Sequence, residues 1–511
     1  MKFISLYLSC SSASFELQNH AIYESPEAYD VKINGKSALK NAKRNVFSLF
    51  DLAPDTDYVI AIGEDQVKIH TLPVSLTLHM KDIVPAQTGD DTLRIQMAIA
   101  ALPENGRLVF DAGEYHASCI FLKSNLTIQI DKGATIYGDP EVKDYPLLPG
   151  EAPYEKGDKP LQLISWEGGP KIGMTSLFTA YHCHNVAIVG EGLVDGQAQK
   201  GQFWVDVKHL TYSRPRLFYF DDCDGVTLQG VTVQNSPSWT IHPYFSKHVN
   251  FYDFAIINPK DAPNTDGIDP ECCDEVSVIG IRFSVGDDCI AIKSGKIYIG
   301  KTYKTPSDHV TIRNCYMHEG HGAVVLGSEA GAGLKHLDVE RCLFEGTDRG
   351  LRVKSRRGRG IDCVMDGIHF KDIRMKHVLT PLAMSMFYFC DPDGKDAWVQ
   401  DKNPAPVDEK TPYLGSFVFE NLECTDAEIA LGFFYGLPEQ PIASISIINS
   451  SFSVKAEAQK GYPSMMSDIE MTSKMGFYFA NVKSVTLDHV KAEGYVGEKT
   501  ILNHVGSFIE T

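Results

Sequence analysis

Residues 273–288 read CDEVSVIGIRFSVGDD, and this short stretch predicts the fold of most of the chain. Val276 and Val278 alternate with polar or small residues, Gly280 interrupts the pattern, and a second apolar run follows. Short apolar runs bounded by Gly, Asp and Ser are typical of short β-strands joined by tight turns.

The same unit recurs along the chain. Its other clear copies are CHNVAIVGEGLVDG (183–196), CDGVTLQGVTVQNS (223–236), SKHVNFYDFAIINP (246–259), SDHVTIRNCYMHEGHG (307–322) and LKHLDVERCLFEGTDRG (334–350). Taken in order, the first core residues of the six units lie 40, 23, 27, 34 and 27 residues apart, and shorter copies continue almost to the C-terminus. Internal repeats of this length indicate a solenoid whose rungs are single turns of parallel strand.

Other repeat folds fit less well. A β-propeller requires longer, four-stranded repeats, and a leucine-rich repeat requires a Leu/Asn ladder and a helix that are missing. We therefore predict an all-β fold, a right-handed parallel β-helix, with a helix near 91–102 covering its open first rung. Insertions at 139–172, 197–215, 295–306 and 391–412 are expected to form rim loops that shape a binding face.

Residues 1–78 are predicted to form a separate small β-sandwich, which leaves residues 79–511 for the β-helix. Within residues 1–78, strand-like runs alternate with turns rich in Gly, Asn, Pro and Asp. The spacing of Leu52, Pro54 and Tyr58 resembles the fibronectin type III pattern, in which the tyrosine makes a corner hydrogen bond. Such modules commonly act as spacers or walls, so we assign this one no chemistry.

Composition limits the partners and the compartment. The chain has 511 residues and a net charge of −18, which repels nucleic acid and anionic membranes, so neither is expected as a partner. No apolar run reaches the length of a membrane-spanning helix. Polar Ser5 and Ser9 interrupt the first apolar run, so we expect a cytoplasmic protein, with secretion or the periplasm as the alternative. The twelve scattered cysteines are expected to be reduced core thiols.

Three aspartates stand in this strand-rich region. Asp266 precedes Asp287 and Asp288 by 21 and 22 residues, about one rung, and neighbouring rungs of a β-helix lie about 4.8 Å apart. We therefore expect the three carboxylates to meet on one face. His321 follows Asp287 by 34 residues and Arg352 follows His321 by 31, so both are expected on the same side.

A cationic stretch accompanies the aspartates. Residues 349–359, RGLRVKSRRGR, carry six Lys or Arg and no acid. Carboxylates beside such a patch suit acid and base work on an anionic substrate: a glycosidase needs one protonated carboxyl to assist the leaving oxygen and one carboxylate to activate water or attack carbon. Crowded like charges raise one pKa, as this division of labour requires. The alternative is that the aspartates are solvated turn residues with no catalytic role.

Four motifs occur in order: Asn264-Thr265-Asp266, Gly286-Asp287-Asp288, Gly320-His321-Gly322 and Arg352-Val353-Lys354. Together they resemble the polygalacturonase family of glycoside hydrolases, and the stretches GEGLVDGQ (190–197) and NSPSWTIHP (235–243) are similar to that family too. The resemblance implies hydrolysis, with inversion, of α-1,4-galacturonosidic linkages in pectin, without metal or cofactor. It implies a polyanionic pectic oligo- or polysaccharide as the partner.

The resemblance also implies roles for individual residues. By position, Asp287 is the general acid, Asp266 and Asp288 hold and activate water, and His321 tunes the acid or contacts the sugar. The further expected substrate-binding residues are Arg352 and Lys354, which would bind the sugar carboxylate, together with Asn264 and His242. His242 and Trp239 either form a sugar platform or stack in the core. Inversion implies carboxyl groups about 6.5–9.5 Å apart.

Several alternatives remain at this point. The N-terminal module, the insertions and the RVKSRRGR stretch are more similar to bacterial exo-acting members, in which a module and rim loops would wall off one end of the groove. A rhamnogalacturonan or xylogalacturonan hydrolase of the same family is the nearest alternative, because subsite loops decide the polymer. A calcium-dependent pectate lyase is another, because three aspartates can supply oxygen ligands. A noncatalytic glycan-binding β-helix is the alternative from another class.

Overall fold

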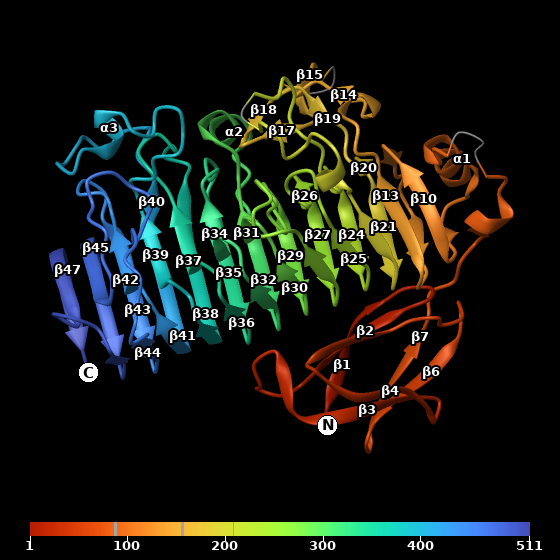
Figure 1. Ribbon diagram of the computed structural model, residues 1–511, viewed down its shortest axis with the longest axis horizontal. Helices are drawn as coiled ribbons and strands as arrows, with labels where there is room; N and C mark the ends of the chain where they lie inside the picture. The colour runs from red at the N-terminus through yellow and green to blue at the C-terminus, as the bar shows by residue number, and fades with distance from the viewer. Residues whose placement is uncertain (86–88, 155–157, 208) are drawn as a thin grey trace.

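The computed structural model describes residues 1–85, 89–154, 158–207 and 209–511. They form a small N-terminal domain of antiparallel strands and a long solenoid of parallel strands, which lies above that domain in Figure 1. No helix in these ranges is long and apolar enough to cross a membrane.

The N-terminal domain consists of two antiparallel sheets that enclose their own core. One sheet contains β1 (Phe3–Leu8), β2 (Ala13–Leu17) and β5 (Val46–Leu49), and the other contains β3 (Glu24–Ile33), β4 (Lys36–Arg44), β6 (Asp57–Ile62) and β7 (Asp65–His70). Phe15, Val31 and Ile60 are fully buried between them. The corner hydrogen bond expected of Tyr58 is present, because its hydroxyl accepts the Ala53 N–H at 2.8 Å. The first strand of the solenoid, β8, begins at Thr77.

The solenoid is built from three parallel stacks of strands, called here stacks A, B and C. Stack A contains β8 (Thr77–His79), β9 (Gly106–Phe110), β12 (Leu126–Ile130), β21 (His184–Gly190), β24 (Asp224–Gln229), β27 (Lys247–Tyr252), β29 (Asp274–Ile279), β32 (Asp308–Arg313), β35 (Leu334–Glu340) and β43 (Ile442–Ile448). Stack B contains β10 (Gly113–Ala117), β13 (Ala134–Gly138), β22 (Leu193–Asp195), β25 (Thr232–Gln234), β28 (Ala255–Ile257), β30 (Arg282–Ser284), β33 (Tyr316–His318), β36 (Leu343–Glu345), β44 (Ser451–Val454) and β46 (Lys491–Glu493).

Stack C carries the functional residues described below. It contains β11 (Ile120–Phe121), β20 (Phe178–Tyr181), β23 (Phe218–Asp221), β26 (Ile241–Tyr244), β31 (Asp288–Ile292), β34 (Gly322–Gly327), β37 (Arg349–Lys354), β39 (Thr380–Ser385) and β42 (Ala430–Tyr435). Near the C-terminus four longer strands bend from one stack into another: β38 (Val364–Lys376), β41 (Ser416–Ala427), β45 (Met475–Asp488) and β47 (Thr500–Glu510).

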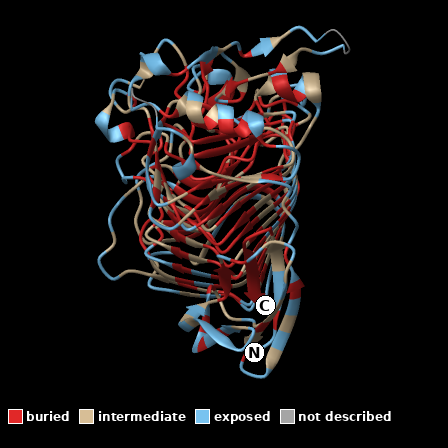
Figure 2. Ribbon diagram, turned by 90° about the vertical axis from the view of Figure 1, so that its right-hand side faces the viewer, coloured by how far each residue is buried: buried red, intermediate tan, exposed pale blue. Residues whose placement is uncertain are grey.

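The register of the rungs confirms the repeat alignment made from the sequence. In stack A the parallel partners run in the order Val186, Val226, Val249, Val276, Val310 and Leu337. All six are buried, because each points into the coil and stacks on the same position of the next rung. Figure 2, which looks along the coil, shows buried residues filling its interior.

Short helices and hairpins decorate the solenoid. Helix α1 (Thr92–Ala101) lies at the N-terminal end of the coil (Figure 1) and buries Ile95 and Ile99 in the solenoid core, as expected of a cap. The remaining short elements are η1 (Met80–Asp82), η2 (Val142–Asp144), η3 (Ala198–Lys200), α2 (Ile297–Tyr303), α3 (Ala397–Gln400), β14 (Leu147–Leu148), β15 (Glu151–Ala152), β16 (Leu161–Gln162), β17 (Ser165–Trp166), β18 (Gly169–Pro170), β19 (Gly173–Met174) and β40 (Tyr413–Leu414). Most lie within the four predicted insertions, and Figure 1 shows them on the side opposite the N-terminal domain.

The N-terminal domain is bound to the solenoid through a buried carboxylate. Glu16 accepts two hydrogen bonds from Arg313, at 2.7 and 2.8 Å, and further bonds from Asn314 at 2.7 Å and Arg341 at 3.1 Å. Only 1% of the Glu16 residue surface is exposed. A buried carboxylate requires such cationic partners, because an unpaired one would lose its hydration without compensation.

Candidate active site

The three predicted aspartates meet at one place on stack C. Asp287 and Asp288 stand at the start of β31, and Asp266 lies one rung earlier, where the Gly267 N–H donates to the Asp288 carbonyl at 3.0 Å. One carboxylate oxygen from each of the three lies within 4.8 Å of the others. The spacing in the sequence therefore becomes proximity in space.

Two cations bind the Asp288 carboxylate. Lys354 Nζ lies 2.6 Å from Asp288 Oδ2, and Arg352 Nη1 lies 3.4 Å from Oδ1. Arg352 and Lys354 are neighbours on the same face of β37, two rungs from β31. Burial opposes the charge of Asp288, but Lys354 and Arg352 outweigh it and lower its pKa below the usual value. Asp288 is therefore the ionised member of the group.

The other two carboxyls are shifted in the opposite direction. Burial, followed by the charge of Asp288, raises the pKa of Asp287. Burial also raises the pKa of Asp266 well above its usual value, and the neighbouring Asp269 and Asp287 add to the effect. Asp266 Oδ1 is buried without a hydrogen-bond partner among the described residues. The group thus separates into one ionised carboxylate and two that favour the protonated form, as crowded acids must.

His321 and Asn264 also line the pocket that contains the aspartates. His321 Nδ1 lies 3.0 Å from Asp348 Oδ2, and this bond is the main cause that raises the pKa of the imidazole. Asn264 Oδ1 accepts a hydrogen bond from Arg214 Nη2 at 2.6 Å. The structure therefore places seven of the eight expected site residues around one cavity, and their roles remain predictions.

His242 lies elsewhere, and its expected contact with substrate is wrong for this structure. Its side chain is fully buried and its Nε2 lies 2.9 Å from Glu271 Oε2, which is equally buried. The ring packs edge-on against Trp239, at 5.1 Å between centroids, and it is Trp239 that lines the pocket. Core stacking, the alternative reading of His242, is what the structure shows.

Lys293 is a pocket residue that the sequence analysis did not select. It follows Asp288 on the same rung, its Nζ lies 3.1 Å from Glu329 Oε2 and 3.4 Å from Asp269 Oδ1, and it sits 4.4 Å above the centre of the Trp239 ring. Lys293 and Glu329 both line the pocket. A lysine at the end of the apolar run CIAIK was the available signal, because an unpaired buried lysine is costly.

The pocket walls include loops that precede and follow the aspartates in the sequence. Glu167, in the turn between β17 and β18, and Met465, between β44 and β45, both line the pocket. Tyr388 and Asp391 follow β39, and Arg359 Nη2 holds Asp391 at 2.7 Å. The structure corrects the expectation that the N-terminal module forms a wall: among the described pocket residues none comes from positions 1–78.

The nearest carboxylate oxygens of the three aspartates lie close together. Inverting glycosidases typically hold their two carboxyl groups about 6.5–9.5 Å apart, and retaining ones about 5–5.5 Å. Here the nearest oxygens of the three aspartates lie within 4.8 Å. Nearest oxygens lie closer together than the carboxyl groups that carry them, so the expected inversion remains a prediction.

Comparison with known proteins agrees with this site. Residues 158–397 match the family described as "Glycosyl hydrolases family 28". The chain is 28% identical to "Probable polygalacturonase" from Vitis vinifera over 391 residues, 74% of each protein. It is 26% identical over 442 residues to "Exo-poly-alpha-D-galacturonosidase" from Dickeya chrysanthemi, which covers 75% of this chain and 70% of that one.

The fold is shared with a solved structure over the whole chain. The Yersinia enterocolitica family 28 exopolygalacturonase superposes with a TM-score of 0.71 at 18% identity, covering 100% of this chain and 98% of that one. The matched family segment contains all seven pocket residues that the motifs predicted. The chain is therefore a glycoside hydrolase whose residues 158–397 match glycosyl hydrolase family 28.

Proposed function

We propose that this enzyme hydrolyses α-1,4-galacturonosidic linkages and releases its products from the end of a galacturonan or oligogalacturonide chain. The observation that carries the proposal is the juxtaposition of the Asp266, Asp287 and Asp288 carboxylates with the Arg352 and Lys354 cations inside a walled pocket. A galacturonate unit offers this site a carboxylate for the cations and a glycosidic oxygen for the acid.

The raised pKa of Asp287 suits the acid step. Protonated Asp287 gives its proton to the glycosidic oxygen as the bond from the anomeric carbon to that oxygen breaks. A water molecule held by Asp266 and Asp288 adds its oxygen to the anomeric carbon, and one of its protons passes to the ionised Asp288 carboxylate, which returns it to solvent after the reaction. One water is consumed, and proton exchange with solvent restores Asp287.

Inversion remains part of the proposal. Asp288 makes a poor nucleophile because Lys354 and Arg352 already occupy its oxygens. Asp266 favours the protonated form, which makes it a poor nucleophile as well. Water is then the better attacking group, and direct attack by water inverts the anomeric centre.

The pocket walls support exo action. An enzyme that cuts within a polymer needs a groove open at both ends, whereas here loops from two distant parts of the chain, at Glu167 and Met465, contribute to the pocket wall. The turn that contains Glu167 also packs closely on Glu329, since a Cβ on Gly168 would meet the Glu329 side chain at 2.7 Å. A chain end fits such a pocket better than an internal unit.

Product analysis on polygalacturonate tests this proposal. We expect mono- or digalacturonate from the first time point, with a slow decline in viscosity. An early spread of long oligomers with rapid loss of viscosity would contradict exo action while leaving hydrolysis intact. Rhamnogalacturonan and xylogalacturonan, assayed in parallel, test the alternative polymers.

Calcium-dependent elimination is disfavoured by the two cations. A calcium ion bound to Asp266, Asp287 and Asp288 would have to displace Lys354 and Arg352 from Asp288. We expect full activity in EDTA and saturated products. Loss of activity in EDTA with rescue by calcium, or an ultraviolet-absorbing unsaturated product, would establish the lyase.

We also propose that the enzyme works in the cytoplasm, where it would meet short oligogalacturonides. All twelve cysteines are free, and eleven of them are buried, which suits a reducing compartment. Fractionation of cells that express the untagged chain tests this placement, and enrichment in the periplasm or the medium would refute it.

A further inference from the structure

A second cluster of ligating side chains lies outside the catalytic pocket, at a turn of the solenoid. Asp308 and His309 open β32, and His336 lies near the start of β35. The neighbouring partners Val310 and Leu337 are in register, so the two histidines occupy equivalent positions on adjacent rungs. Both have left-handed backbones, with φ of +48° and +46°, a conformation in which Asn, Asp and His are over-represented.

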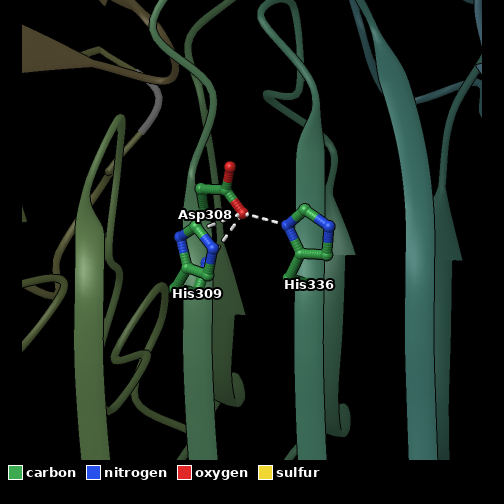
Figure 3. A group of neighbouring side chains, drawn as sticks. All are labelled: Asp308, His309 and His336. Atoms are coloured by element: carbon green, nitrogen blue, oxygen red, sulfur yellow. Dashed lines mark hydrogen bonds and ion pairs between the residues drawn. The ribbon is translucent and has the colours of Figure 1, made fainter.

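The three side chains converge on one oxygen. Figure 3 shows both imidazoles directed at the Asp308 carboxylate. His336 Nδ1 lies 2.7 Å from Asp308 Oδ1, and His309 Nδ1 lies 3.5 Å from the same atom. The rings stack at 5.0 Å between centroids, with 18° between their planes. The stacking of successive rungs thus fixes the spacing of the three ligand atoms, all within 4.8 Å of one another.

We propose that Asp308, His309 and His336 form a binding site for one divalent transition-metal ion of the zinc class. Zinc binds imidazole nitrogen at about 2.0–2.1 Å and carboxylate oxygen at about 2.0–2.2 Å, so two ligands in a tetrahedral shell lie roughly 3.4 Å apart. The observed separations of 2.7 and 3.5 Å from the shared oxygen bracket that value. Both histidines are more than half exposed, which leaves the remaining positions open to water.

The ligand set selects the class of ion. Two imidazoles and one carboxylate suit zinc, nickel, cobalt or copper, whereas calcium and magnesium prefer shells made of oxygen. His309 Nδ1 also lies 3.0 Å from Asp274 Oδ1 on the preceding rung, so binding replaces a hydrogen-bonded proton on that ring.

A neighbouring histidine provides a matched control. His248 occupies the corresponding turn position of β27, with φ of +50°. Its two nitrogens contact different acids, Asp224 at 2.6 Å through Nδ1 and Glu275 at 3.3 Å through Nε2. Among the described residues, this histidine belongs to no group of three converging ligands.

The site would join rungs that lead away from the catalytic strands. β32 and β35 follow β31 and β34 along the chain, and β31 begins at Asp288. An ion shared by two rungs stabilises the folded state, because the unfolded chain does not hold the three ligands together. Bound zinc should therefore raise the unfolding temperature, and the chemistry in the pocket does not depend on it.

Calorimetric titration of the full, tag-free chain with Zn²⁺ tests the proposal. We expect one tight equivalent, a higher unfolding temperature with Zn²⁺, and at least a tenfold weaker affinity in the double variant His309→Asn/His336→Asn. Asparagine tolerates the left-handed backbone, so these variants keep the turn. The control His248→Asn should bind as the wild type does.

Two results would overturn the site. One is equal affinity in the wild type and the double variant, and the other is a wild-type chain that binds no stoichiometric zinc. If the double variant fails to fold, zinc-edge X-ray absorption of the wild type decides: two imidazole ligands are expected, and a shell of oxygen alone refutes the proposal. These measurements are independent of hydrolysis.

Discussion

Lys354 Nζ lies 2.6 Å from Asp288 Oδ2. This ion pair links a cation that is expected to bind substrate to a carboxylate that is expected to take part in catalysis. Only 1% of the Asp288 side-chain surface and 11% of that of Lys354 are exposed. The lysine therefore has two effects, since it attracts an anionic sugar and holds Asp288 ionised.

Substitution of Lys354 separates these effects. In Lys354→Met we expect kcat/KM on oligogalacturonides to fall by two to three orders of magnitude, because losing one partner of a buried charge pair costs about 2–5 kcal/mol. The pKa of Asp288 rises without the cation, so the acidic limb of the pH–rate profile should move to higher pH. Lys301→Met, an exposed control that pairs with Glu409, should change neither. An unmoved acidic limb would contradict the coupling.

Removing the proton donor tests the assignment of Asp287. Asp287→Asn should lower kcat by about 10²–10⁴-fold, the usual contribution of general acid catalysis. Circular dichroism and the unfolding temperature should stay close to the wild type. The exposed Asp224→Asn serves as the matched control. A rate within tenfold of the wild type would remove Asp287 from the acid role.

The buried carboxyl of Asp266 is expected to support activity at the expense of stability. Its folded pKa is raised, so its contribution to stability is complete below the unfolded value of about 3.9 and is lost as pH rises towards the folded value. Asp266→Asn should therefore be more stable than the wild type at neutral pH, by about 1–3 kcal/mol, because the amide is neutral at every pH and has no raised pKa to oppose. Urea unfolding measures the gain.

The advantage of Asp266→Asn should disappear below the unfolded pKa, where the wild-type carboxyl is protonated in both states. Activity should fall at every pH, because the amide changes the hydrogen bonds that hold the attacking water beside Asp288. A variant that is no more stable than the wild type at neutral pH would show that Asp266 is ionised without cost.

The anomeric configuration of the first product tests the attacking group. Proton NMR of a reaction followed from its start should show the β-anomer before mutarotation, because water attacks the α-linked carbon directly. Initial appearance of the α-anomer would identify Asp266 or Asp288 as a nucleophile.

The domain interface should depend on Glu16. Glu16→Gln leaves Arg313 and Arg341 without their buried anion, and breaking such a pair costs about 3–5 kcal/mol. We expect a clear drop in the unfolding temperature by calorimetry. Glu340→Gln, which changes a partly exposed partner of Arg341, should cost less than about 1 kcal/mol. Equal effects of the two substitutions would mean that the interface does not rest on Glu16.

The sequence was sufficient to predict most of the coil and the centre of the site. Each rung repeats the same buried position, so apolar residues recur at a regular spacing in the sequence. Val276 and Val310 could therefore be aligned from the sequence alone. The spacing of Asp266 and Asp287 by about one rung is part of the same pattern, so their meeting followed from the fold.

Residues set by loops or by buried pairs could not be predicted in this way. Met465 reaches the pocket from the segment between β44 and β45, whose path no periodicity describes. His242 was misread because its partner, Glu271, belongs to the next rung and removes the ring from solvent. The side-chain directions that bring the aspartates within 4.8 Å likewise depend on packing, which the rung spacing alone does not determine.

Glu16 is separated from Arg313 by 297 positions and from Arg341 by 325. The ribosome therefore releases the first domain long before its binding surface on the solenoid has been synthesised. This anchoring carboxylate stays in water until the rungs of β32 and β35 have formed, whereas contacts to earlier rungs, such as that of Tyr7 with Tyr252, can form sooner. The contact made by Glu16 is then a late event in the life of the nascent chain, and it joins the N-terminal domain to the middle of the polypeptide only after most of the coil has been made.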